Sequence, residues 1–277
     1  GGARAWADEP PRSMRASATD ATGGAGGGGD GWRWPARAHG RRLASSAPMP
    51  IHRSQPDPPD VAGLAGDPVP GPAPRVVDVL GSPRAGLYAH YRRYQQPMFT
   101  LCCPVALDVG RWKAAEGGLF LNVLYAVLEG VNAVPELRQR IRVEDGRDVV
   151  VEHARVDCTC TVARDDGSFS FCPVASDPER GRFVARGRAA MDATRTAGGL
   201  DLSQQGRDDL VYVSSVPWME VTGVVHAMSG DPDDCVPRLL WGRAEGGRMT
   251  LCATAHHSLV DGLHLGRFFA EVARRLE

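Results

Sequence analysis

Lysine is nearly absent from this sequence of 277 residues, which has one lysine (Lys113) against 31 arginines and only two asparagines and two isoleucines. This bias is typical of GC-rich coding DNA, in which long spurious reading frames are common. The chain starts at Gly1, and Met49 is a plausible true start. We therefore hypothesise that the residues before Met49 are upstream sequence that is not translated.

Long apolar runs and an excess of charge of one sign are also missing. No run approaches the ~20 apolar residues of a membrane-spanning helix, and the first residues lack the pattern of a secretory signal. The 32 basic and 33 acidic side chains nearly cancel, which disfavours binding to nucleic acid. We expect a cytoplasmic protein with neither a membrane nor a nucleic-acid partner.

Residues 1–78 lack apolar periodicity but hold 13 of the 33 glycines and 12 of the 21 prolines. Such a composition cannot bury enough apolar surface to offset the entropy lost on ordering the chain. We expect this segment to be disordered. A single folded domain is expected over residues 79–277.

The cysteines lack the spacing of a metal or redox motif. Seven is an odd number, and neither Cys102-Cys103 nor Cys158-Thr159-Cys160 has the two-residue gap of a zinc knuckle. We expect small, buried, reduced thiols, and no metal site made from them.

Helix and strand patterns alternate in the second part of the chain. Residues 119–134 are apolar on nearly all sides, which predicts a buried helix. Strands are predicted within 148–161, over 210–216 and over 248–255. Apolar residues from 265 to 276 recur at the spacing of one helix face. The last strand thus leads through a short loop into the final helix.

That loop contains the most informative residues. A histidine held in one tautomer can take a proton from an alcohol and return it, so His257 is the candidate general base. Asp261, four residues later, could hold the loop in place. Two alternatives stay open: Asp261 as an ordinary helix cap, and a metal site of His257, Asp261 and His264.

Residues 256–264, His-His-Ser-Leu-Val-Asp-Gly-Leu-His, resemble the signature of the chloramphenicol acetyltransferases. Other acyltransferases carry the shorter core of this motif near mid-chain, whereas only 13 residues follow His264 here. A motif this close to the C-terminus is compatible with two groups, the chloramphenicol acetyltransferases and the catalytic domains of dihydrolipoamide acyltransferases, which share a fold.

Further stretches resemble the chloramphenicol acetyltransferases in their order and approximate spacing from about residue 84 to the end. The N-terminal segment does not resemble the lipoyl domain that a dihydrolipoamide enzyme normally carries. The resembling stretches are 90–94, 132–138, 214–218 and 237–243.

The resemblance implies an acetyl-CoA-dependent O-acetyltransferase, of the kind that confers antibiotic resistance, acting on chloramphenicol or a similar small hydroxyl compound. His257 would remove the hydroxyl proton, and Ser214 would donate a hydrogen bond to the oxyanion. Tyr94 matches an aromatic residue of the acceptor pocket. Trp218 and Arg243 match positions near the coenzyme A channel.

The family resemblance also implies a fold and an assembly. The fold would be a two-layer α/β sandwich, with a mixed sheet and helices on one face. The assembly would be a homotrimer with each active site between two subunits. Acetyl-CoA would be a cosubstrate that leaves as free coenzyme A, and no metal would be needed.

Two positions depart from the family pattern. Leu87 stands where the family has an arginine that pairs with the loop aspartate, so Asp261 lacks its usual partner. Arg84, one turn earlier, or Arg92 or Arg93, one turn later, could take the place of that arginine if the helix geometry allows it. Leu240 stands where the family has a threonine that holds a water molecule. We expect its apolar side chain to make the acceptor pocket drier.

These departures leave other functions open. A catalytically weak relative could persist as a trimeric binding module. The acceptor could also be a different hydroxyl compound, or a dihydrolipoyl thiol supplied by a separate lipoyl protein.

Overall fold

A computed structural model describes residues 72–277. The segment predicted to be disordered, residues 1–78, lies outside the described residues up to residue 71, as does the predicted start at Met49. The first strand pairs with β4 and begins at Arg75, a few residues before the predicted domain boundary. The elements are β1 (Arg75–Val76), α1 (Ala85–Tyr91), β2 (Met98–Ala106), α2 (Val109–Ala114), α3 (Gly118–Ala133), the 3-10 helix η1 (Pro135–Arg138), β3 (Gln139–Glu144), β4 (Arg147–Glu152), β5 (Asp157–Ala163), β6 (Phe169–Val174), α4 (Arg180–Thr196), β7 (Leu210–Val216), β8 (Arg238–Gly242), β9 (Arg248–His256) and α5 (Gly262–Leu276).

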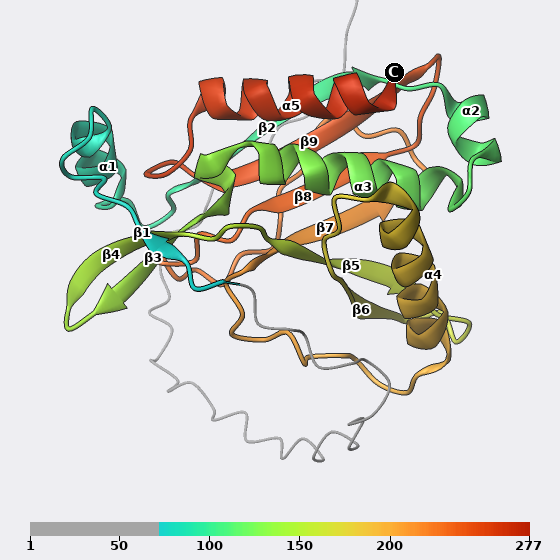
Figure 1. The fold of residues 1–277 in the computed structure, drawn as a ribbon, viewed down its shortest axis with the longest axis horizontal. Helices are drawn as coiled ribbons and strands as arrows, with labels where there is room; N and C mark the ends of the chain where they lie inside the picture. The colour runs from blue at the N-terminus through green and yellow to red at the C-terminus, as the bar shows by residue number, and fades with distance from the viewer. Residues whose placement is uncertain (1–71) are drawn as a thin grey trace, which may run out of the picture. The chain divides into compact units, whose positions relative to one another are not determined.

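A mixed sheet of six strands forms the main layer, in the order β2-β9-β8-β7-β5-β6. The β5–β7 and β7–β8 pairs are parallel, and the other pairs are antiparallel. Helices α3, α4 and α5 lie together over one face of this sheet (Figure 1). The expected two-layer α/β sandwich is confirmed.

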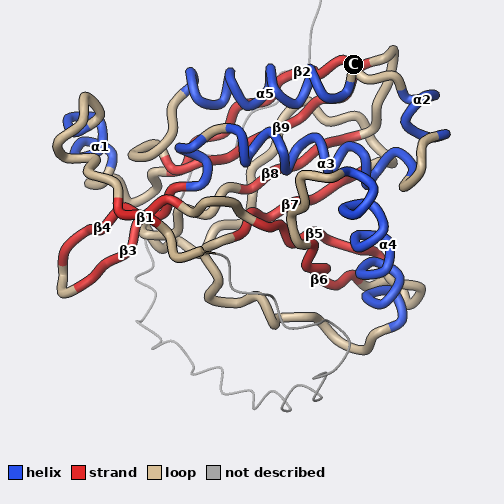
Figure 2. Tube along the Cα trace, in the orientation of Figure 1, coloured by secondary structure: helices blue, strands red, loops and turns tan. Residues whose placement is uncertain are grey.

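The opposite face of the sheet has no helix layer within the described residues (Figure 2). Strand residues alternate between the two faces, and the register places Thr161, Ser214, Leu240 and Cys252 side by side on four neighbouring strands. We call this side the open face. It carries the predicted oxyanion donor.

The buried helix α3 is close to the predicted range of 119–134, and its middle is almost fully inaccessible to solvent. Gly130 allows α5 to approach closely, because a Cβ atom there would lie 2.7 Å from Cγ2 of Val272. The final helix α5 buries the predicted stripe that includes Leu265, Phe268 and Val272. The two helices therefore pack as one apolar layer against the sheet.

The other predicted elements are found with one change. Strand β7 has the predicted bounds, and β9 is one residue longer than predicted. The stretch 148–161 is divided between β4 and β5, which belong to different sheets. Asn132 stabilises the start of β5, because its side-chain amide exchanges two hydrogen bonds with the backbone of Val156.

The cysteines differ from the expectation of seven reduced thiols. Cys102 and Cys252 face each other across β2 and β9 and form a disulfide. The other five are free, and four of these are buried, including Cys158 and Cys160 on β5. None of the helices within residues 72–277 is long and apolar enough to cross a membrane.

Candidate active site

The loop between β9 and α5 is built around a helix cap. The Asp261 carboxylate accepts a hydrogen bond from the backbone N–H of Leu263, and the His264 ring accepts one from the Asp261 N–H. This reciprocal arrangement satisfies two donors at the start of α5. The cap is one of the alternatives that the sequence left open for Asp261, and it is compatible with a second role.

The His257 imidazole is held in a defined tautomer. Its Nδ1 lies 3.1 Å from the carbonyl oxygen of Val260, which can only accept, so Nδ1 carries the proton. Nε2 is therefore unprotonated in the neutral ring and has a free lone pair. This is the form that a general base requires.

Two aromatic rings enclose the His257 ring. The Tyr91 ring is stacked on it with centroids 3.8 Å apart and planes 6° apart, and the Phe99 ring lies 4.2 Å away on a tilt of 26°. The backbone N–H of His257 donates to the Pro97 carbonyl. These contacts fix the orientation of the ring and limit its exposure to water.

The preceding histidine is structural. The His256 Nδ1 accepts from the N–H of Ser258, so Nε2 carries the proton and donates to the Pro232 carbonyl at 3.1 Å. Burial lowers the pKa of the His256 imidazole to about 4. His256 thus stays neutral near pH 7 and anchors the loop that contains His257.

Arg84 is the partner of Asp261. Its NH1 donates to Oδ2 of Asp261 at 2.7 Å, while Nε and NH2 donate to the carbonyls of Ser258 and His257 at 2.8 and 3.0 Å. Burial raises the pKa of Asp261, but the bond from Arg84 and the nearby His264 outweigh it, so the pKa lies below its usual value. Arg84 is the substitute that holds the loop despite the leucine at position 87.

The N-terminal helix is shifted by about one turn from the expected match. The structure brings Tyr91, not Tyr94, against His257, whereas Tyr94 is exposed and lies 3.0 Å from the His90 ring. Arg84 and Tyr91 each lie three residues before the positions that the resemblance assigned, Leu87 and Tyr94. One three-residue shift therefore accounts for both differences.

Ser214 lies on the open face of β7, half-buried, where its Oγ is 3.4 Å from Oγ1 of Thr161. Leu240 is its direct neighbour on β8 and is opposite Cys252 on β9. His257 follows Cys252 by five residues, which places it about 16 Å along the sheet and about 10 Å across it from Ser214. Within one chain, Ser214 and His257 are thus roughly 19 Å apart and cannot contact the same atom.

The predicted coenzyme residues lie on neighbouring segments. The backbone N–H of Arg243 donates to the carbonyl of Met219 at 2.7 Å, and Met219 follows Trp218. The Trp218 side chain is 66% exposed, and the Arg243 guanidinium lies 3.0 Å from Glu245. These two residues therefore follow the same end of the parallel strands β7 and β8.

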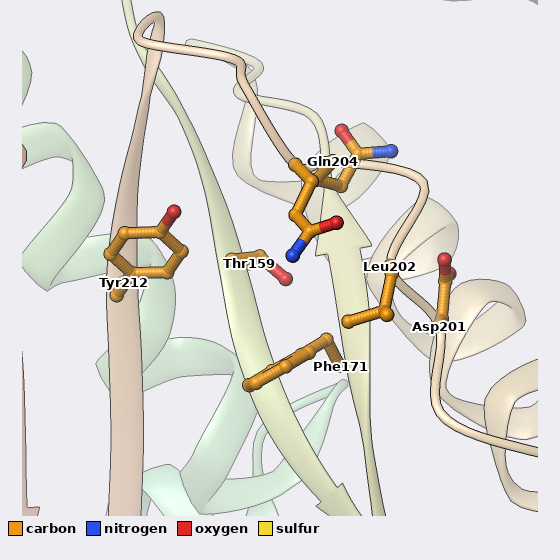
Figure 3. A pocket seen from close by; sticks show the side chains of 7 residues that line it. Thr159, Phe171, Asp201, Leu202, Gln204 and Tyr212 are labelled. Carbon is orange, nitrogen blue, oxygen red and sulfur yellow. The ribbon is translucent and has the colours of Figure 1, made fainter. Parts of the chain in front are cut away.

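A pocket of about 220 Å³ lies on the open face (Figure 3). Thr159 and Tyr212 are paired in register at its base, two residues before Thr161 and Ser214 on the same strands. The Oγ1 of Thr159 is buried and has no hydrogen-bond partner in the described part of the chain. The pocket is lined by Thr159, Phe171, Asp201, Leu202, Gln204, Gln205 and Tyr212.

The sequence analysis missed this pocket. The alternation of β7 could have identified Tyr212, because it lies two residues before Ser214 and hence on the same face. The residues from 201 to 205 belong to an irregular segment, for which no periodic signal exists. Within residues 72–277, no group of three His, Cys, Asp or Glu residues is placed to hold a metal ion.

Two curated chloramphenicol acetyltransferases resemble the chain in sequence. The enzyme of Campylobacter coli is 22% identical over 200 residues, which are 71% of this chain and 95% of that protein. The enzyme of Vibrio anguillarum is 24% identical over 202 residues, which are 72% of this chain and 92% of that protein. No family model matches the chain.

Solved structures of acetyltransferases also align with the chain. A chloramphenicol acetyltransferase aligns with a TM-score of 0.66 and 24% identity, covering 74% of this chain and 100% of the other. A dihydrolipoamide acetyltransferase of Azotobacter vinelandii aligns with a TM-score of 0.51 and 16% identity, covering 80% and 96%. The chain is a divergent relative of the chloramphenicol acetyltransferases and has the coenzyme A-dependent acyltransferase fold.

Proposed function

We propose that the protein is an acetyl-CoA-dependent O-acetyltransferase that moves an acetyl group to a hydroxyl of chloramphenicol or a similar small acceptor. The observation that carries the proposal is the tautomer of His257, whose Nδ1 is bound to the Val260 carbonyl. Nε2 then takes the acceptor proton as the hydroxyl oxygen attacks the thioester carbonyl. The same atom returns the proton to the coenzyme A thiolate as the C–S bond breaks.

Ser214 supplies the hydrogen bond to the tetrahedral oxyanion in this proposal. Its hydroxyl belongs to a strand in the middle of the sheet, so it is preoriented, and such donors contribute about 2.7–4 kcal/mol to transition-state stabilisation. The distance of roughly 19 Å to His257 in one chain means that the His257 of one subunit acts with the Ser214 of another. The proposal therefore includes a homotrimer with active sites between subunits.

The pocket on the open face is the proposed acceptor site. Phe171 and Leu202 offer apolar walls, and the Thr159 hydroxyl offers a polar group that has no partner among residues 72–277. Leu240, adjacent to Ser214, excludes water from the reacting oxygen. Trp218 and Arg243, which follow the ends of β7 and β8, are the proposed contacts for coenzyme A.

A second candidate function is acetyl transfer to a dihydrolipoyl thiol. The structural similarity to the Azotobacter vinelandii enzyme favours it, because that protein is a dihydrolipoamide acetyltransferase. It requires a separate lipoyl protein as acceptor. A binding module without activity is the third possibility.

Chromatographic detection of coenzyme A released from acetyl-CoA separates these functions, because transfer to dihydrolipoamide consumes one thiol for each one formed and leaves the total thiol count unchanged. We expect release that depends on chloramphenicol or on another small alcohol of a panel, and that is lost in His257→Ala while coenzyme A binding and oligomer mass are unchanged. Release with dihydrolipoamide alone would support the second function. No release with any acceptor would support the binding module and overturn the proposal.

A further inference from the structure

Arg92 connects the end of α1 with two other segments of the chain near the His257 loop. It directly follows Tyr91 at the end of α1, and its side chain is only 15% exposed. Nε and NH2 donate to the two carboxylate oxygens of Asp148 on β4 at 2.7 and 2.9 Å. NH2 also donates to Asp233 at 2.7 Å, and NH1 donates to the Pro232 carbonyl at 3.2 Å.

The Pro232 carbonyl is shared with the active-site loop. It accepts from Nε2 of His256 as well as from Arg92, and Nδ1 of His256 in turn accepts from the N–H of Ser258. A continuous path of hydrogen bonds therefore runs from Arg92 through His256 to the residue after His257. Loss of Arg92 would free the Pro232 segment and remove the support of His256.

A second path reaches His257 from the other side. Tyr91 is the covalent neighbour of Arg92, and its ring is stacked on the His257 ring at 3.8 Å. The two bonds to Asp148, which also accepts from Tyr88, fix the end of α1 against β4. Arg92 thus determines where the Tyr91 ring lies.

We propose that Arg92 is a positioning residue for His257, acting through Pro232 and His256 on one side and through Tyr91 on the other. It touches neither the reacting atoms nor His257 itself. The proposal rests on the proposed acetyltransferase activity for its kinetic test but predicts a structural signature that is independent of it.

The structural signature is the protonation of His256, which depends on the charged groups around it. The groups that face it are Arg92 from α1, Asp148 from β4, and Asp233 and Asp234 from the preceding loop. Arg92 lowers the pKa of His256, whereas Asp233 and Asp234 raise it. Burial still lowers the pKa of His256 without Arg92, and Asp234 stays paired with Arg238. Loss of the Arg92 charge nevertheless moves this pKa upward, and a protonated ring can no longer accept from Ser258.

The test compares Arg92→Met, Arg92→Lys and Asp148→Asn with Arg195→Met, an exposed arginine paired with Asp192 on α4. In Arg92→Met we expect kcat for thiol release to fall on the order of 10²-fold, the effect of a misplaced catalytic group. The KM for acetyl-CoA stays near the wild-type value, and the pKa of His256, followed by NMR, moves upward.

Two other variants, Arg92→Lys and Asp148→Asn, separate the effect of the hydrogen-bond geometry from the effect of the positive charge. Arg92→Lys keeps the positive charge but loses the paired N–H donors of the guanidinium, and Asp148→Asn removes the anchor together with a negative charge. Both are expected to lower kcat without raising the pKa of His256. Long-range ¹⁵N NMR of the imidazoles reports the tautomer and titration of His256 without any assay. If Arg92→Met does not fold, Arg92→Lys and Asp148→Asn carry the test alone.

The outcomes are distinct. A wild-type protein that releases no thiol contradicts the proposed function, while the NMR comparison still decides the role of Arg92 in holding His256. Rates and His256 signals in the variants equal to those of Arg195→Met would overturn the proposal.

Discussion

Arg84 and Asp261, 177 positions apart in the sequence, are joined by a 2.7 Å ion pair that fastens α1 to the loop of the candidate base. The same guanidinium holds the carbonyls of His257 and Ser258. Arg84 therefore fixes three of the five loop residues from 257 to 261. An arginine at position 87 is not needed for this purpose.

Arg84→Met is expected to reduce kcat/KM on the order of 10²-fold, because the loop that orients His257 loses its anchor. Steady-state thiol release measures the loss, and Arg195→Met controls for the removal of an exposed arginine. A normal rate in Arg84→Met would contradict the role of this pair. Recovery in Arg84→Met/Leu87→Arg would show that either turn of α1 can supply the cation.

The stability of the protein is expected to fall as the pH decreases from about 6.5 to about 4. His256 has a pKa of about 4 in the folded protein against 6.5 ordinarily, so the unfolded chain binds more protons in this window. The shift corresponds to a loss of about 3 kcal/mol at the low end.

Urea unfolding between pH 7 and pH 4 measures this loss, and His256→Asn should flatten the dependence. An equally steep dependence in His256→Asn would assign the effect to another group.

Ser214→Ala is expected to lower kcat about 10²- to 10³-fold with little change in KM, because an oxyanion donor acts mainly in the transition state. Ser215→Ala is the matched control, since the neighbouring side chain points to the other side of the strand. Equal effects in the two variants would indicate a structural role for Ser214.

Thr159→Val tests the acceptor pocket. The Thr159 hydroxyl is buried and has no hydrogen-bond partner in the part of the chain that the structure describes, so its removal should leave the protein as stable or more stable. The KM for the acceptor should rise about 2- to 10-fold, as expected for one neutral hydrogen bond. Thr159→Ser should retain the wild-type KM. An unchanged KM in Thr159→Val would place the acceptor elsewhere.

The elements with strong periodic patterns could be predicted from the sequence. The buried helix α3, the strand β7 and the amphipathic α5 all lie within one or two residues of their expected bounds, because a periodic pattern reports burial directly. The loop between β9 and α5 also has the expected place. Its signal is the set of polar residues His257, Ser258 and Asp261 between two apolar elements.

The register of α1 could not be predicted, because residues three apart lie on the same side of a helix. Leu87 and Tyr94 were therefore as good a match as Arg84 and Tyr91. The pocket depends on the irregular segment from 201 to 205, and the split of 148–161 depends on which sheet each half joins. These features are set by tertiary contacts that leave no local pattern.

The central claim, catalysis by His257 with a Ser214 from another subunit, is tested most directly by complementation. His257→Ala and Ser214→Ala are each expected to be nearly inactive. When the two are co-expressed at equal levels, about one quarter of the sites in a mixed cyclic trimer combine an intact histidine with an intact serine. The account predicts recovery of about one quarter of the wild-type thiol release. Activity no higher than that of the two separate variants would contradict it.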